Sequence, residues 1–179
     1  MPRCPASAPC SGTLDGAVER VGAALAEAER AAGRPVVPAG MSLGGYAALA
    51  AAVRHPELTA GLLLNNCTAQ PRGGAARWYG RAGRLVRRAG EGWPARLNAA
   101  LFLALAGRCS VPLLTANSRA DRLFRSDERR FLAAARAAGA PASLVHIGGS
   151  HLVALSDPET FTRVLRAGHE RLTGMGADR

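Results

Sequence analysis

The sequence contains no lysine and few aromatic residues. All 23 of its basic residues are arginines, and Phe, Trp and Tyr together make up 4% of the chain. The formal charge of +10 therefore indicates a bias in composition as much as a basic function, because no zinc-finger spacing, basic heptad or aromatic RNA-binding signature accompanies it. We predict no nucleic-acid partner, although the positive charge favours acidic surfaces and substrates.

Closely spaced cysteines, a leader and long apolar runs are also lacking. Cys4, Cys10, Cys67 and Cys109 form no CxxC pair, which argues against a metal site or a disulfide framework and is typical of thiols in a reducing cytoplasm. The first twelve residues have no apolar core of a signal peptide. No apolar run approaches the roughly 18 residues of a membrane span. We expect a soluble, cytoplasmic protein.

The remaining pattern is that of one α/β domain spanning residues 1–179. A chain of this length can bury one good core, and 48% of its residues are apolar. Strands alternate with helices of crossover length, which predicts a mostly parallel sheet flanked by helices. The predicted helices are 14–33, 42–55, 126–139, which Ser126 would cap, and one from 156, which Ser156 or Asp157 would cap. The predicted strands are 34–40, 58–67, 110–118 and 142–149.

The segment at about 70–108 breaks this alternation. It contains seven arginines between Arg72 and Arg96 against one acid, Glu91. The pattern predicts one or two amphipathic helices outside the sheet, a small helical cap insert. Two interpretations remain open for its arginines: a solvated basic face, or a lid over a site.

Three chemically useful side chains follow predicted strands. Ser42 comes after "PVVPAGM", Asp121 after "PLLTANSRA" and His151 after "SLVHIGGS". Ligands bind beyond the carboxyl ends of strands in an open parallel sheet, so these loops are expected to meet. A serine hydroxyl becomes a nucleophile when a histidine takes its proton and a carboxylate orients the imidazole. The sequence therefore supplies a candidate nucleophile, acid and base.

Glycines flank the serine in "GMSLGGY". A serine in a tight turn between strand and helix needs small neighbours, which we assign to Gly40 and Gly44. The helix that follows would direct its free N–H groups toward a developing oxyanion, the backbone N–H of Leu43 among them.

Each assignment has rivals. Ser42 could be an ordinary helix N-cap, and Asp127 or Asp157 could be the acid, although both stand at predicted helix starts. Among the other histidines, His55 ends a helix, His146 lies within a strand and His169 lies on the polar last helix. Asn65 and Asn66 end a strand near the site, where we expect their side chains to hydrogen-bond the backbone groups at the end of the sheet.

Three motifs in order resemble the α/β-hydrolase family. "GMSLGG" matches its G-x-S-x-G nucleophile elbow, "NSRADRLF" is similar to its acid turn, and "HIGGSHLVALSDPETF" is similar to its histidine loop and final helix. The resemblance covers residues 14–69 and 109–168. It implies a serine hydrolase acting on a carboxylic ester or similar acyl substrate, with Ser42, Asp121 and His151 as the triad and no metal or organic cofactor.

The sequence departs from that family ahead of the elbow. Members normally place several strands and an HG-type oxyanion loop there, whereas 41 residues precede Ser42. The strand at 34–40 is then expected to lie at the sheet edge, where Pro38 is tolerated and a second copy could pair. Either the natural protein starts upstream of Met1, or the chain is a shortened and catalytically impaired relative. A lyase or acyltransferase on the same fold is a further alternative.

Overall fold

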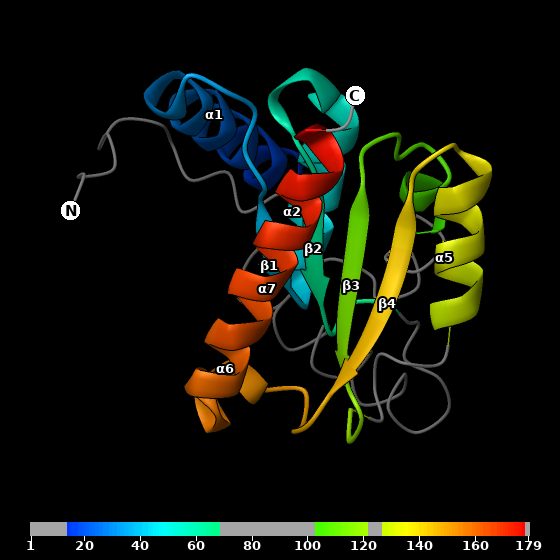
Figure 1. Cartoon of the computed structure of the whole chain (residues 1–179). Coiled ribbons are helices and arrows are strands. Elements are labelled where there is room, and N and C mark those ends of the chain that lie inside the picture. Colours follow the sequence, from blue (N-terminus) through cyan, green and yellow to red (C-terminus); the bar gives the residue numbers. More distant parts are fainter. Residues whose placement is uncertain (1–13, 69–102, 122–126, 178–179) are drawn as a thin grey trace, which may run out of the picture.

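The structure is a computed structural model that describes residues 14–68, 103–121 and 127–177 of the chain (Figure 1). Its elements follow the predicted alternation of strands and helices. They are α1 (Leu14–Ala32), β1 (Ala39–Met41), α2 (Leu43–Arg54), the 3-10 turn η1 (Pro56–Leu58), β2 (Leu62–Asn65), β3 (Leu113–Ser118), α5 (Glu128–Ala137), β4 (Ala142–Ile147), α6 (Val153–Ser156) and α7 (Pro158–Ala177).

The four strands form one parallel sheet in the order β1-β2-β3-β4. The register aligns Met41 with Asn65, and Asn65 with Ala116, so the carboxyl ends of the strands meet at one edge of the sheet. Within the described residues β1 is an edge strand, as the sequence predicts. The predicted α/β class and parallel sheet are confirmed.

Alternate residues of the central strands enter two separate apolar cores. Leu62 and Leu64 on β2 pack with α1, α2 and α5 on one face, whereas Leu63 packs with Leu114 of β3 and Leu172 of α7 on the other. This alternation is the strand period of two, and every residue of β2 is buried. Because both faces are covered, the first three residues of β2 are all leucine.

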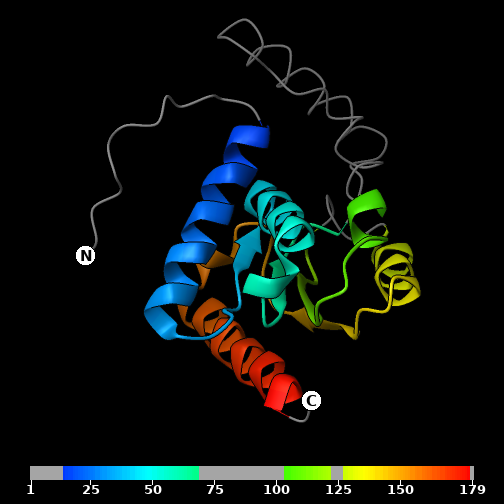
Figure 2. The ribbon, with the colours of Figure 1, turned by 90° about the horizontal axis from the view of Figure 1, so that it is seen from above.

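The helices lie on the two faces in the same way. Helix α2 packs against β1 and β2 and is covered by α1, while α5 packs beside β4. Helix α7 crosses the opposite face, against β2 and β3 (Figure 2). The result is a three-layer arrangement that buries both faces of the central strands β2 and β3 and leaves the carboxyl edge of the sheet to the loops.

Two predicted strands are shorter than expected. Residues 34–40 form a strand only from Ala39 onward, with one isolated bridge between Val36 and Thr59. Pro38 separates the two because it has no N–H to donate, although its carbonyl accepts from Leu63 N at 3.0 Å. Apart from that bridge at Thr59, the run at 58–67 forms a strand only over β2, since the chain ahead of it turns through η1 after the helix.

The structure shows which residues lie at the starts of two helices whose caps were predicted. Helix α5 begins one residue after Asp127, which makes no side-chain capping hydrogen bond, and the expected cap Ser126 lies outside the described residues. The last helix is divided: α6 ends at Ser156 and α7 begins at Pro158. Between them Asp157 Oδ1 accepts from Thr160 N at 3.0 Å, so Asp157 caps α7 as one of the two predicted candidates.

The cap segment expected at about 70–108 lies mostly outside the described residues, and residues 103–106 at its end are helical. Among the helices that the structure describes, none combines the length and apolar character needed to cross a bilayer.

Gly168 lets α7 approach the sheet, and we predict that Gly168→Ala lowers the free energy of unfolding. A Cβ there would lie 2.3 Å from Leu63 Cδ1 and 3.0 Å from Leu114 Cδ2, and overpacking of this kind costs about 1–3 kcal/mol. Gly174→Ala on the same helix is the matched control, because no described atom lies within 4 Å of its added Cβ. Urea unfolding of both variants tests this; equal stability would contradict it.

Candidate active site

The carboxyl edge of the sheet brings the three candidate side chains together. Ser42 follows β1, Asp121 lies three residues beyond β3, and His151 lies four residues beyond β4. The last two loops are joined by backbone bonds, from Arg119 N to Ile147 O (2.8 Å) and from Ala120 N to Gly149 O (3.1 Å). The loops therefore meet as the parallel topology predicts.

Ser42 occupies a sharp turn between β1 and α2. Its backbone has φ 50° and ψ −122°, a region that non-glycine residues rarely adopt. Its side chain makes no capping hydrogen bond to α2, so the ordinary N-cap role does not account for it. Its backbone N–H donates to Asn65 O at 3.0 Å, which ties the turn to β2. Strained residues of this kind occur at functional sites, where the surrounding structure holds them.

Close approach across the turn explains two glycines, but not the pair expected. A Cβ on Gly40 would lie 2.6 Å from both Gly44 O and Gly45 Cα, and one on Gly45 would lie 2.5 Å from Cys67 Sγ. Gly44 is exposed, and no described atom lies within 4 Å of its added Cβ. The steric assignment to Gly44 is therefore wrong: Gly40 and Gly45 allow the strand and helix to approach.

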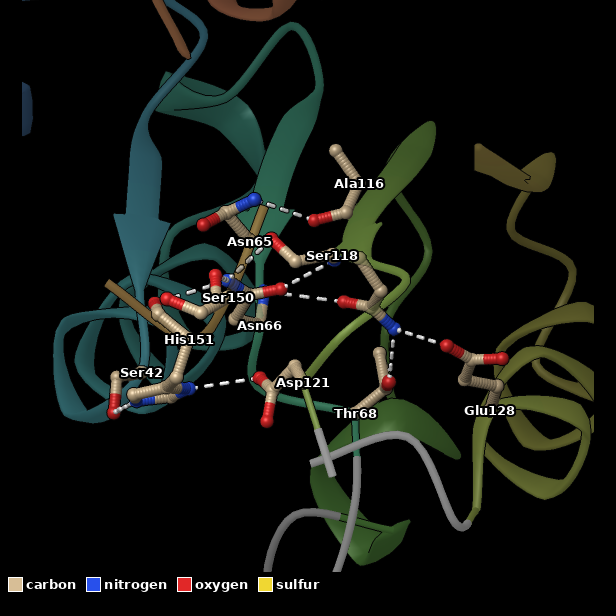
Figure 3. A network of polar contacts seen from close by, with 11 residues as sticks. Ser42, Asn65, Asn66, Thr68, Ala116, Ser118, Asp121, Glu128, Ser150 and His151 are labelled. Carbon is tan, nitrogen blue, oxygen red and sulfur yellow. Dashed lines mark hydrogen bonds and ion pairs between the residues drawn. The ribbon is translucent and has the colours of Figure 1, made fainter. Parts of the chain in front are cut away.

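His151 bridges the other two side chains (Figure 3). Its Nδ1 lies 2.8 Å from Asp121 Oδ2, and its Nε2 lies 3.0 Å from Ser42 Oγ. A carboxylate can only accept, so it favours the tautomer in which Nδ1 carries the proton and the Nε2 lone pair faces the serine hydroxyl. This is the arrangement by which a histidine removes a serine proton.

The bridge runs from a buried acid toward solvent. The Asp121 side chain is fully buried and that of His151 is 17% exposed. Because charges interact more strongly where water is excluded, an imidazolium formed at His151 would be stabilised by Asp121.

The rival residues lie elsewhere. Asp157 caps α7, and the hydrogen bonds from Thr160 hold the pKa of its carboxyl below the usual value. Asp127 precedes α5, 4.0 Å from Arg130. The other histidines are placed as follows: His55 lies 3.6 Å from Glu57, His146 lies 3.0 Å from Glu128, and His169 lies on α7.

A buried polar network beside the site was not foreseen. Asn117, on β3, donates from Nδ2 to Thr68 Oγ1 and to Glu128 Oε1, the latter at 2.9 Å. The second oxygen of Glu128 contacts His146 Nε2 at 3.0 Å. No sequence signal identifies this network. From the sequence, Glu128 is an ordinary acid in the first turn of a helix, and His146 is one residue within a strand.

Asn65 completes the sheet end as expected, whereas Asn66 also reaches the histidine loop. Asn65 Nδ2 donates to Ala116 O at 2.6 Å, as that role requires. Asn66 Oδ1 accepts from Ser118 N at 2.7 Å, which also belongs to the sheet end, but its Nδ2 donates to His151 O at 3.0 Å. The second contact reaches the histidine loop and was not expected.

Two exposed leucines, here called the apolar rim, directly follow residues of the site in the sequence. Leu43 directly follows Ser42 and is 62% exposed, and Leu152 directly follows His151 and is 51% exposed. Leu43 begins α2, where backbone N–H groups have no acceptor within the helix. In the part of the chain that the structure describes, no group of three or more His, Cys, Asp or Glu could hold a metal ion.

Comparison of the sequence with protein-family models and with curated proteins finds no match. Solved structures do match. An α/β-hydrolase enzyme, MGS-MChE2, from the metagenome of Mar Chica lagoon sediments is 20% identical, with a TM-score of 0.58 over 86% of this chain and 70% of that one. The chain has the α/β-hydrolase fold.

Two further α/β-hydrolase structures give similar values. A thermophilic esterase from Thermogutta terrifontis is 23% identical, with a TM-score of 0.59 over 87% of this chain and 73% of that one. A monoacylglycerol lipase from Paleococcus ferrophilus is 17% identical, with a TM-score of 0.59 over 90% and 76%. The structures with this fold that the chain resembles therefore include hydrolases.

The thiol of Cys67 lies against Gly45, beside the turn that carries Ser42. Its side chain is fully buried, and burial, reinforced by the negative charge of Asp121, raises the pKa of the Cys67 thiol. Burial also raises the pKa of the Cys109 thiol. Because the thiolate is the reactive form, both thiols should be inert at neutral pH.

We predict that Cys67 and Cys109 resist alkylation until the protein unfolds. In a variant with Cys4 and Cys10 replaced by serine, iodoacetamide at pH 8 should modify the native protein about 10³-fold more slowly than the unfolded chain, if exposure requires global opening. The raised pKa keeps both thiols protonated at this pH, whereas a thiol of ordinary pKa near 8.5 is partly ionised. Rapid modification of the native protein, measured by mass spectrometry, would contradict this prediction.

Proposed function

We propose that the chain is a serine hydrolase that cleaves a carboxylic ester or a similar acyl substrate. The observation that carries the proposal is the continuous contact from Asp121 through His151 to Ser42, with Ser42 at positive φ. A serine in that conformation has a backbone cost of about 1–3 kcal/mol, and its side chain caps no helix. Nucleophilic use accounts for both features.

In the proposed first step, Ser42 Oγ attacks the acyl carbon while His151 Nε2 takes the hydroxyl proton. Asp121 holds the imidazole through Nδ1 and stabilises the imidazolium. The tetrahedral intermediate collapses as His151 returns the proton to the leaving alkoxide, which departs as an alcohol. The acyl group is then bound to Ser42 as an ester.

In the second step, water takes the place of the alcohol. His151 Nε2 removes a proton from the water, whose oxygen attacks the acyl carbon. Collapse of the second intermediate releases the carboxylic acid, and the proton on His151 returns to Ser42 Oγ. The chain is restored without any other reactant.

The backbone N–H of Leu43 would donate to the oxyanion in both steps. It lies at the start of α2, where the free N–H groups and the helix dipole favour negative charge. An oxyanion donor is commonly worth about 10²–10³ in rate. Turnover therefore depends strongly on a second donor as well.

The exposed leucines at the rim favour an apolar acyl substrate. Leu43 and Leu152 each adjoin a reacting side chain and present apolar surface there, and such surface gains about 25 cal/mol per Å² when a ligand covers it. Two of the compared structures, an esterase and a monoacylglycerol lipase, agree with ester chemistry on this fold.

A catalytically impaired relative is the second candidate. It is favoured by the edge position of β1 within the described sheet, since family members normally have further strands and an oxyanion loop on that side. Such a protein would keep an activated serine yet turn over slowly. An acyltransferase would use the same three side chains with an acceptor other than water, and a lyase would use them without acyl transfer.

We predict that a fluorophosphonate probe labels Ser42. Mass spectrometry of the wild-type protein should place the phosphonate on the peptide containing Ser42, and Ser42→Ala should not be labelled. Ser156→Ala is the matched control, because the Ser156 hydroxyl donates to the backbone oxygen of Leu152 instead of facing a histidine ring nitrogen. Absence of label in the wild type, or equal label in Ser42→Ala, would contradict the proposal.

Turnover separates the hydrolase from the impaired relative. With p-nitrophenyl butyrate, the proposed enzyme should lose kcat by about 10⁴-fold in Asp121→Asn, because the imidazole is then held in the wrong tautomer. A wild-type protein that takes the label at Ser42 but hydrolyses no ester would instead be the impaired relative.

A further inference from the structure

The loop that carries His151 needs an anchor. It runs from the end of β4 through Gly148 and Gly149, the latter at φ 92°, to α6. Glycines leave a backbone free to move, whereas proton transfer requires His151 to stay within hydrogen-bond reach of Ser42. The contact that fixes this loop therefore decides how well the site is assembled.

The side chain of Asn66 makes that contact (Figure 3). Its Nδ2 lies 3.0 Å from His151 O and 3.3 Å from Ser150 O, so the amide donates to the backbone of the histidine loop. Nδ2 also lies 3.0 Å from Ser118 Oγ, while Oδ1 accepts from Ser118 N at 2.7 Å. One fully buried amide thus joins β3 to the loop after β4.

The backbone of Asn66 is itself held in place. Its φ of 50° turns the chain away from β2, a conformation that asparagine tolerates better than most residues. Its N–H lies 3.1 Å from Asn117 Oδ1 and 3.3 Å from Ala116 O. Asn117 in turn donates to Thr68 and Glu128. The unforeseen polar network therefore fixes the amide that reaches the histidine loop.

The end of β2 also holds the serine. Asn65 O accepts from Ser42 N at 3.0 Å, and the next residue, Asn66, donates to His151 O at 3.0 Å. Ser42 and His151 are separated by 109 residues in the sequence, yet each backbone is one hydrogen bond from this pair of asparagines. The end of β2 therefore supports both sides of the 3.0 Å contact between His151 Nε2 and Ser42 Oγ.

We propose that Asn66 is the positioning residue of the site, holding the His151 loop at its working distance from Ser42. This inference rests on the proposed function, and it gives Asn66 a role beyond completing the sheet end. The sheet-end role needs only an acceptor for Ser118 N, whereas the positioning role needs the two N–H donors. Replacing the amide by a carboxylate separates these roles.

Asn66→Asp keeps the Oδ1 acceptor and the side-chain shape, but places a carboxylate oxygen against the carbonyls of Ser150 and His151. We expect kcat/KM for p-nitrophenyl butyrate to fall by about 10²-fold, because a displacement of about 1 Å at the reacting groups costs that much. The loss should lie in kcat rather than KM, since Asn66 is fully buried whereas the leucines of the apolar rim are exposed.

Asn65→Asp is the matched control. Asn65 is adjacent, equally buried, and donates only from Nδ2 to Ala116 O, within the sheet. The same change of amide to carboxylate should cost stability there but alter kcat less than tenfold. Equal losses of kcat in the two variants would overturn the proposal, because the effect would then be that of any buried charge at the end of β2.

A second readout does not require turnover. The Nδ1 proton of His151, bound to Asp121, should give a downfield NMR resonance, assigned by its absence in His151→Gln. We expect this resonance in the wild type and Asn65→Asp, and its loss or broadening in Asn66→Asp. Because the resonance reports geometry, it tests Asn66 even if the protein proves not to hydrolyse esters. An unchanged resonance in Asn66→Asp would refute the positioning role.

If Asn66→Asp does not fold, Asn66→Gly takes its place in the NMR experiment. Glycine accepts a φ of 50° without strain and removes all the side-chain contacts. The resonance should again be lost, while Asn65→Gly retains it. A folded Asn66→Gly protein that keeps the resonance would refute the positioning role as directly as an unchanged Asn66→Asp.

Discussion

The close approach of β1 and α2 across Ser42 is the constraint on which the rest of the site depends. It requires two residues without a Cβ, Gly40 and Gly45, and it forces Ser42 into a conformation that costs about 1–3 kcal/mol. The packing of α2 into the core, together with the bond from Ser42 N to Asn65 O, offsets this cost. The hydroxyl is thereby turned toward His151 instead of capping the helix.

The parallel pairing of the strands brings the loops that carry Asp121 and His151 to the same edge of the sheet as Ser42. Since all four strands run in one direction, the turns after β1, β3 and β4 converge at one edge. The buried amides at the end of β2 lie between them and connect three segments that are distant in sequence. Stability and site geometry are coupled at this point, because the groups that complete the sheet also position the histidine loop.

Much of this arrangement can be predicted from the sequence. Apolar runs and helix periodicity identify the elements, and three motifs in the order serine, aspartate, histidine identify the side chains that meet. These signals are local. Each depends on residues within a few positions of one another, as in the glycines around Ser42 or the glycines ahead of His151.

The features that sequence reasoning misses depend on contacts between distant segments. Whether Gly44 or Gly45 faces Cys67 is decided by the rotation of α2 against β2. The pairing of Glu128 with Asn117 and His146 requires α5 to lie beside β3 and β4. The reach of Asn66 to His151 spans 85 residues. In each case the residue type is unremarkable locally, and only the tertiary arrangement gives it a role.

The measurement that tests the central claim most directly is a crystal structure of the protein after reaction with a phosphonate ester. The account predicts a bond from phosphorus to Ser42 Oγ, with His151 Nε2 beside the leaving-group position and a phosphoryl oxygen within hydrogen-bond distance of Leu43 N. Phosphorus on another residue, or an adduct at Ser42 whose phosphoryl oxygen points away from Leu43 N with His151 turned from Asp121, would contradict it.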